Sequence, residues 1–127
     1  MRNFRRKGTA IVIESGELVH TICDFLKSFG YDAISAPTHE LAAGRARQHP
    51  TIALLAAAVP APDESQAGIY LEEASKRNRH IAVVLMLSDP LEQSPGAPES
   101  AVKIVKPFGY DTLIEAIELS EIRAQNN

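Results

Sequence analysis

Four apolar runs of this sequence end at one edge of a predicted sheet. The runs are "TAIVI", "TIALLAAAV", "IAVVLML" and "AVKIV". Their β-branched and aliphatic residues are typical of buried strands, and the carboxyl ends of parallel strands lie side by side. The residues at these ends are Glu14 and Ser15, Ala56 and Ala57, Leu87 and Ser88, and Val105 and Lys106. A carboxylate, hydroxyls and an ammonium group are therefore expected close together, where they could hold a small ligand.

The sequence offers little for catalysis. No pair of residues indicates a nucleophile with its base. The stretch "ESGELV" after the first run holds a single glycine, unlike a phosphate-binding loop. The histidines show no metal-ligand spacing; they are His20, His39, His49 and His80. An enzyme is the least favoured class, and neither a metal nor a cofactor is predicted.

Strand and helix patterns alternate along the chain. Strands are predicted over residues 9–13, 31–36, 51–59, 81–87 and 101–105, and helices over 17–29, 38–48, 69–77 and 110–123. Gly30 is expected just after the first helix, and Thr38 is expected to cap the second. This alternation predicts an α/β fold, a doubly wound five-stranded parallel sheet of the flavodoxin-like order 2-1-3-4-5. Residues 1–127 are predicted to be a single domain, with 1–8 as a basic N-terminal tail.

Charge and composition narrow the partners. The chain has 16 Asp and Glu against 13 Lys and Arg, and four of the basic residues are Arg2, Arg5, Arg6 and Lys7. The remaining body is distinctly acidic, which argues against nucleic acid as a direct partner. No apolar run is long enough to cross a membrane. The single cysteine, Cys23, is expected in or beside the core, and a cytoplasmic protein is the default expectation.

Five segments together carry a resemblance to a known family. They are "IVIES", "FLKSFGYDAISA", "IALLAAAVP", "AVVLMLS" and "KIVKPF". In this order and spacing, the chain resembles a response-regulator receiver (CheY-like) domain over nearly its whole length. The segment "VKPF", between a buried strand and a C-terminal amphipathic helix, is the most telling.

Some receiver site positions are retained. The resemblance implies that Glu14 is one of the family's acidic pair, Ser88 its switch hydroxyl, and Lys106 its phosphate-contacting lysine. It also implies a cis peptide bond between Lys106 and Pro107. With fewer carboxylates around it, we expect Lys106 to turn toward Glu14, directly or through water, or else toward solvent.

Other receiver positions are lost. The second acidic position falls on Ser15, the phospho-acceptor aspartate on Ala56, and the aromatic switch on Lys103. Alanine is no nucleophile, and a site with one carboxylate and a lysine should bind Mg²⁺ poorly. The resemblance therefore implies a degenerate pseudo-receiver that lacks the phospho-acceptor aspartate.

The connection between the last two strands also departs from the family. Receivers usually place a fourth helix there, but the span from Ser88 to Lys106 is short and contains Pro90, Pro95 and Pro98. Proline in a helix interior costs about 3 kcal/mol. A shortened or absent fourth helix is predicted, whereas the loop over 60–68 looks longer than usual.

The last helix has two apolar positions off its predicted buried side. Tyr110, Leu113, Ile114 and Ile117 are predicted to form the buried stripe. Leu119 and Ile122 fall on the other side. They are either ordinary exposed residues or a contact patch for a partner.

The leading hypothesis is an atypical receiver domain of two-component-type signalling that acts by phosphorylation-independent contact with protein partners. We expect a monomer or a weak homodimer. The alternative from another class is a small-ligand-binding module on the same flavodoxin-like fold. A thermal-shift ligand screen would separate the two.

Overall fold

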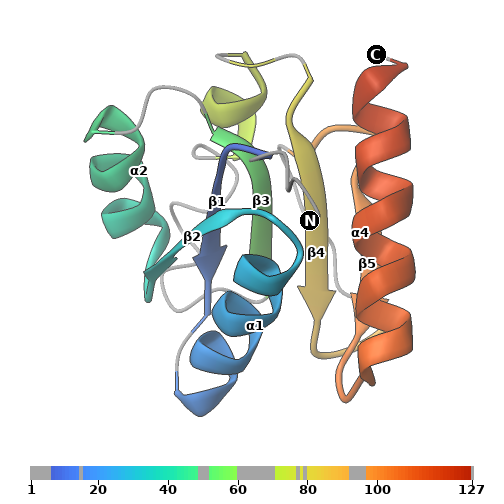
Figure 1. The fold of residues 1–127 in the computed structure, drawn as a ribbon. Coiled ribbons are helices and arrows are strands. Elements are labelled where there is room, and N and C mark those ends of the chain that lie inside the picture. The colour runs from blue at the N-terminus through green and yellow to red at the C-terminus, as the bar shows by residue number, and fades with distance from the viewer. Residues whose placement is uncertain are drawn as a thin grey trace, which may run out of the picture.

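The computed structural model contains a five-stranded parallel sheet between two helical layers (Figure 1). It describes residues 7–14, 16–48, 52–59, 71–76, 78, 80–91 and 97–126. The strands are β1 (Thr9–Ile13), β2 (Asp32–Ala36), β3 (Ile52–Val59), β4 (Ala82–Leu87) and β5 (Val102–Val105). The helices are α1 (Glu17–Ser28), α2 (His39–Gln48) and α4 (Tyr110–Gln125), and residues 71–76 are also helical. The strand order β2-β1-β3-β4-β5 confirms the predicted flavodoxin-like fold.

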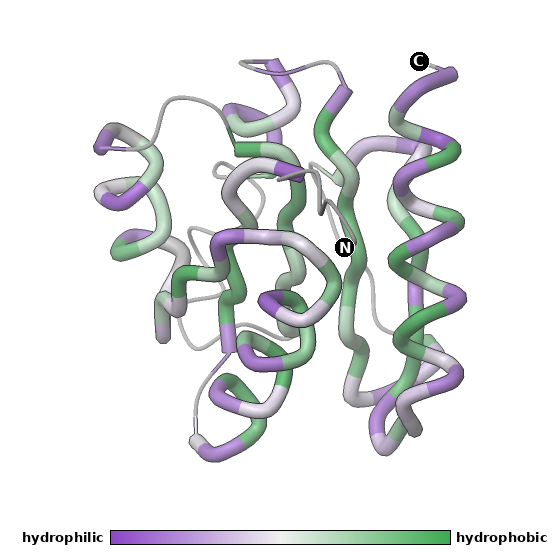
Figure 2. The backbone as a smooth tube through the Cα atoms, viewed as in Figure 1, coloured by the Kyte–Doolittle hydropathy of each residue, from purple (hydrophilic) through white to green (hydrophobic). Residues whose placement is uncertain are grey.

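The two central strands are buried on both faces. All six residues of β4 are buried, and β3 is buried at six of its eight positions. Figure 2 shows both strands as largely hydrophobic, whereas α4 alternates between hydrophobic and hydrophilic residues. Helices cover both faces of a parallel sheet, so its central strands need continuous apolar sequence rather than alternation.

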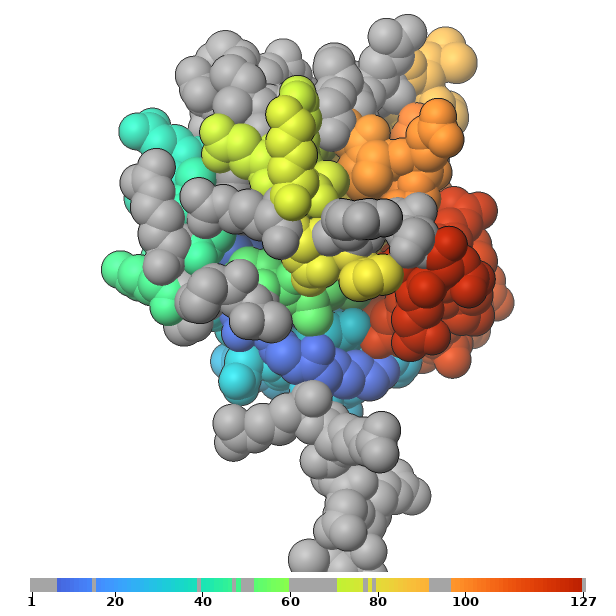
Figure 3. Space-filling model, turned by 90° about the horizontal axis from the view of Figure 1, so that it is seen from above, coloured from blue at the N-terminus to red at the C-terminus, as the bar shows by residue number. Residues whose placement is uncertain are grey.

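Alternate side chains of each strand enter two separate cores. One core, the α1/α4 core, contains Val12, Val84 and Met86 together with α1 and α4. The other contains Ile13, Leu85 and helical residue Leu71, together with α2. Figure 3, seen from above, places the 71–76 segment (yellow-green) and α4 (red) on opposite sides of the molecule.

Local signals at the helix ends act as predicted. The Thr38 hydroxyl accepts a hydrogen bond of 3.1 Å from the backbone N–H of Leu41, which is an N-cap interaction. Gly30 adopts a positive φ of 106° directly after α1. The following N–H, of Tyr31, then donates back to the carbonyl of Leu26 over 3.0 Å. A residue with a side chain rarely adopts this conformation, which explains the glycine.

The predicted buried stripe of the last helix is partly wrong. Tyr110 is 61% exposed, since it begins α4 beyond the end of the sheet, and Ile114 is only half-buried. The helix instead buries Leu113, Ala116, Ile117, Ser120 and Ala124 against the sheet. Small residues bring α4 close to β4 and β5. A sequence pattern based on large apolar residues gives these small residues too little weight. Cys23 lies in the α1/α4 core, as predicted.

Two predicted irregular segments are only partly described. The connection after β4 forms turns at residues 88–91 and 97–101, and none of these described residues is in an α-helix. Residues 92–96, the loop over 60–68 and tail residues 1–6 lie outside the described residues. Among the helices that the structure describes, none has both the length and the apolar character needed to cross a bilayer.

Lys7 and Tyr31 converge on one carboxylate of α4. The Tyr31 hydroxyl donates to Oε2 of Glu121 over 2.6 Å, and Nζ of Lys7 lies 3.0 Å from the same oxygen. Burial, first, and then the hydrogen bond to Glu121 raise the pKa of the Tyr31 hydroxyl well above its usual value. The contact therefore favours the neutral phenol. It also holds Lys7, just before β1, against α4.

Replacing Tyr31 by phenylalanine should lower the free energy of unfolding by about 1 kcal/mol at neutral pH. The pKa of Tyr31 is higher in the folded state than in the unfolded chain, where it is about 10. The stabilisation is therefore complete below about pH 10 and is lost as pH rises toward the folded-state pKa. Urea unfolding across this range should show a steeper alkaline loss in the wild type than in Tyr31→Phe. Parallel curves would contradict the assignment.

Candidate functional site

The strand ends bring the predicted site residues to one edge of the sheet. Ile13 is in register with Ala57, and Leu87 is in register with both Val59 and Val105. The backbone N–H of Ser88 donates to Val59 over 2.8 Å, and that of Lys106 donates to Leu87 over 2.8 Å. These bonds extend the ladder by one residue and hold Ser88 and Lys106 at the strand ends.

Lys106 and Glu14 form an ion pair across this edge. The Glu14 side chain is 8% exposed and that of Lys106 is 26% exposed. The contact confirms the predicted turn of Lys106 toward Glu14. A buried carboxylate needs a compensating charge, and Lys106 supplies one from a partly exposed position.

Ala56 occupies the place that the resemblance gives to the phospho-acceptor. It is 2% exposed and lies between Val12 and Val84 in the sheet register. Its methyl group packs in the α1/α4 core, whereas that of Ala57 packs in the opposite core. Neither alanine has a side-chain oxygen for phosphorus or for a metal, and both methyl groups belong to the hydrophobic core.

The residues present do not fit the Mg²⁺ site of a receiver. Mg²⁺ requires several oxygen ligands in near-octahedral geometry. The Glu14 carboxylate already pairs with Lys106, and Ala56 contributes no side-chain oxygen. A divalent cation at this edge would also lie next to the Lys106 ammonium group, which repels it.

Three further positions matched to receiver site residues, and one predicted cis peptide bond, remain to be placed. The Lys106–Pro107 peptide bond is cis, which confirms the prediction. Ser88 is exposed at the edge, and Lys103 is exposed on β5. Ser15 lies outside the described residues.

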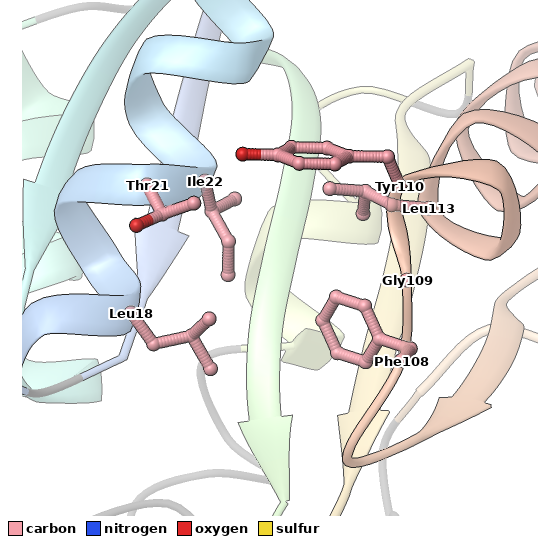
Figure 4. Close-up of a pocket in the computed structure, with 7 residues that line it drawn as sticks. All are labelled: Leu18, Thr21, Ile22, Phe108, Gly109, Tyr110 and Leu113. Carbon is pink, nitrogen blue, oxygen red and sulfur yellow. The ribbon is translucent and has the colours of Figure 1, made fainter.

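An apolar groove lies between α1 and the start of α4, and the sequence interpretation missed it. Figure 4 shows its two walls facing one another, with the Tyr110 ring reaching across toward α1. Its volume is about 200 Å³, and it is lined by Leu18, Thr21, Ile22, Phe108, Gly109, Tyr110 and Leu113. Tyr110 was predicted to be buried, but here it borders an open groove together with Leu18.

Leu119 and Ile122 are exposed on α4, at 40% and 55%. Their place off the buried side agrees with the sequence. Two further apolar side chains are exposed: Leu91, which follows β4, at 86%, and Val105, which ends β5, at 37%.

Solved receiver domains share this fold. A CheY-like receiver domain protein from Methanospirillum hungatei JF-1 matches with a TM-score of 0.76 at 19% identity, over 97% of this chain and 100% of that one. A response regulator receiver protein from Sinorhizobium medicae WSM419 matches with a TM-score of 0.76 at 17% identity, over 92% and 98%. The receiver domain of the hybrid histidine kinase CckA matches with a TM-score of 0.69 at 22% identity, over 90% and 99%.

Neither a protein-family model nor a curated protein sequence matches this chain. The likeness to these solved structures shows the CheY-like fold.

Proposed function

We propose that this domain is an atypical receiver, a pseudo-receiver of two-component-type signal transduction that contacts protein partners without being phosphorylated. The observation that carries the proposal is the Glu14–Lys106 ion pair at the sheet edge, together with the burial of Ala56 in the core. The position of the phospho-acceptor holds Ala56, which is no nucleophile, and the charge of Lys106 is already balanced by Glu14. A cytoplasmic location fits a chain with one cysteine, which cannot form an intramolecular disulfide.

The domain acts as a binding module rather than as an enzyme. Ser88 and Lys106 remain at the edge without a nucleophile that they could assist. Its output therefore comes from surfaces that are present all the time. The size of the groove argues against a small-ligand role, since about 200 Å³ is below the usual range of about 300–1,000 Å³ for ligand pockets.

Leu119 and Ile122 supply the proposed partner surface on α4. Replacing both by aspartate should abolish capture of a native protein partner, because two exposed apolar side chains would become charged. The free energy of unfolding should change by less than about 0.5 kcal/mol, since both positions are exposed. Pull-down from the native cell and sedimentation would check this, with Thr112→Asp as the exposed control on the same helix. A tight homodimer that survives the double change would contradict the surface assignment.

Introducing carboxylates at the two receiver positions that lack them tests whether their absence prevents Mg²⁺ binding. Ser15→Asp with Ala56→Asp should bind Mg²⁺, whereas the wild type and Ala56→Asp alone should not. With a Kd of about 1 mM, about 10 mM Mg²⁺ would stabilise the double variant by about 1.4 kcal/mol and raise Tm by about 3–6 °C.

The matched control is Ser15→Asp with Ala57→Asp. It adds the same two carboxylates, but the Ala57 side chain points into the opposite core. Equal Mg²⁺ stabilisation of both double variants would show that the receiver positions are not the determinant.

A further inference from the structure

An incompletely closed aromatic seam runs along the contact between α1 and α4. The Tyr110 ring lies 5.6 Å from that of Phe25, and the Phe25 ring lies 5.8 Å from that of Phe29. The groove by Leu18 opens at the Tyr110 end. We call this ladder of rings with the adjoining groove the α1–α4 seam. Phe25 and Phe29 are half-buried and Tyr110 is exposed, so apolar surface remains open along the rings.

Lys7 occupies the other end of the seam. Its ammonium group lies 4.2 Å from the centre of the Phe29 ring and pairs with Glu121 of α4. A cation over an aromatic face beside a carboxylate is a favourable arrangement. The first described residue of the chain is therefore already bound where the seam ends.

Acidic residues border the seam on both helices. On α1, Glu17 and Asp24 are exposed and flank the groove residue Thr21 at helical spacing. On α4, Glu118 is exposed and lies between Tyr110 and Glu121 along the helix axis. An occupant of the seam should therefore carry basic side chains around an apolar one.

The segment that directly precedes Lys7 has this composition. It reads "MRNFRR", with Arg2, Arg5 and Arg6 around Phe4. We propose that the α1–α4 seam binds the chain's own N-terminal segment, residues 1–6. Phe4 enters the groove beside Tyr110, and the arginines lie against the acidic borders.

The length of the segment suits the distance. Phe4 precedes Lys7 by three residues, which span about 10 Å when extended. The two ring spacings from Phe29 to Tyr110, 5.8 and 5.6 Å, cover a similar length. Local attachment also makes the binding intramolecular, so the segment does not have to be captured from solution. The seam includes neither Leu119 nor Ile122, and this inference does not depend on the proposed function.

A spin label at residue 3 tests the proposal. The label is attached to Asn3→Cys in a Cys23→Ala background, and amide signals are compared before and after reduction of the label. At low salt, we expect the amides of Thr21 and Tyr110 to lose more than half of their intensity, and that of Gly44 on α2 to keep it. Asp24→Lys with Glu118→Lys should reduce the loss at least twofold, because it reverses both acidic borders, whereas Glu99→Lys, away from the seam, should not.

Two results would overturn the proposal. One is equal intensity loss at Thr21 and Gly44, or none at either. The other is loss that appears only when labelled and ¹⁵N-enriched chains are mixed, which would assign the seam to a second copy. Should Cys23→Ala disturb the core, Phe4→Trp provides the sole tryptophan of the chain. Its quenching by acrylamide should then be at least twofold weaker than in Phe4→Trp with Asp24→Lys and Glu118→Lys, and equal quenching would refute the binding.

Discussion

Replacing Lys106 by methionine should lower the free energy of unfolding by about 2 kcal/mol, whereas Glu14→Gln should cost less than about 1 kcal/mol. The difference follows from burial. The Glu14 side chain is 8% exposed, so removal of Lys106 leaves a carboxylate in a largely dry place without its counter-charge. The Lys106 side chain is 26% exposed, so after Glu14→Gln its ammonium group can turn to water.

The double variant Glu14→Leu with Lys106→Met separates the effect of the two charges on stability from the effect of side-chain packing. It removes both charges and keeps similar volumes, so its stability should return to within about 1 kcal/mol of the wild type. Urea unfolding of the wild type, Glu14→Leu, Lys106→Met and the double variant forms a double-mutant cycle. Two single variants that each cost less than about 0.3 kcal/mol would instead show a pair that contributes as little as an ordinary surface contact.

The strands were predictable because their signal is strong and local. Runs such as "IAVVLML" have no alternation, which indicates burial on both faces, and β4 is indeed buried throughout. The contact between Glu14 and Lys106 was predicted from the resemblance to receiver domains, because β3 and β4 separate their two strands in the sheet and strand ends alone would not pair them. The N-cap at Thr38 and the glycine at residue 30 rest on equally local chemistry.

The α1–α4 seam was not predictable from periodicity. An apolar pattern treats Leu18, Phe25 and Tyr110 as core residues, but whether a helix edge is covered depends on the gap to its neighbour. α4 packs on the sheet through Ala116 and Ser120, and Tyr110, which begins the helix, stays 61% exposed. The small residues Ala116, Ser120 and Ala124 recur at every fourth position of α4 and mark its buried side. An apolar pattern misses this signal because it gives small residues less weight than tyrosine.

Phosphorylation should fail completely, which is the largest effect expected of any treatment. Phosphoryl transfer to an aspartate requires a carboxylate in line with the donor phosphorus and a metal to neutralise the developing charge. At the corresponding place, the Ala56 methyl group is 2% exposed within the core. Lys106 is paired with Glu14 rather than directed at a phosphoryl group. Sliding the register brings only Ala57 and Ala58 to the position, so no alternative acceptor is available on β3.

Intact-protein mass spectrometry after incubation with acetyl phosphate and Mg²⁺ tests this central claim most directly. A phosphorylatable receiver domain in the same tube serves as the positive control. We predict that the control gains the mass of one phosphoryl group while this chain keeps its unmodified mass, and that beryllofluoride shifts no amide signal near Ser88. A phosphorylated fraction of this chain comparable to that of the control would contradict the pseudo-receiver account.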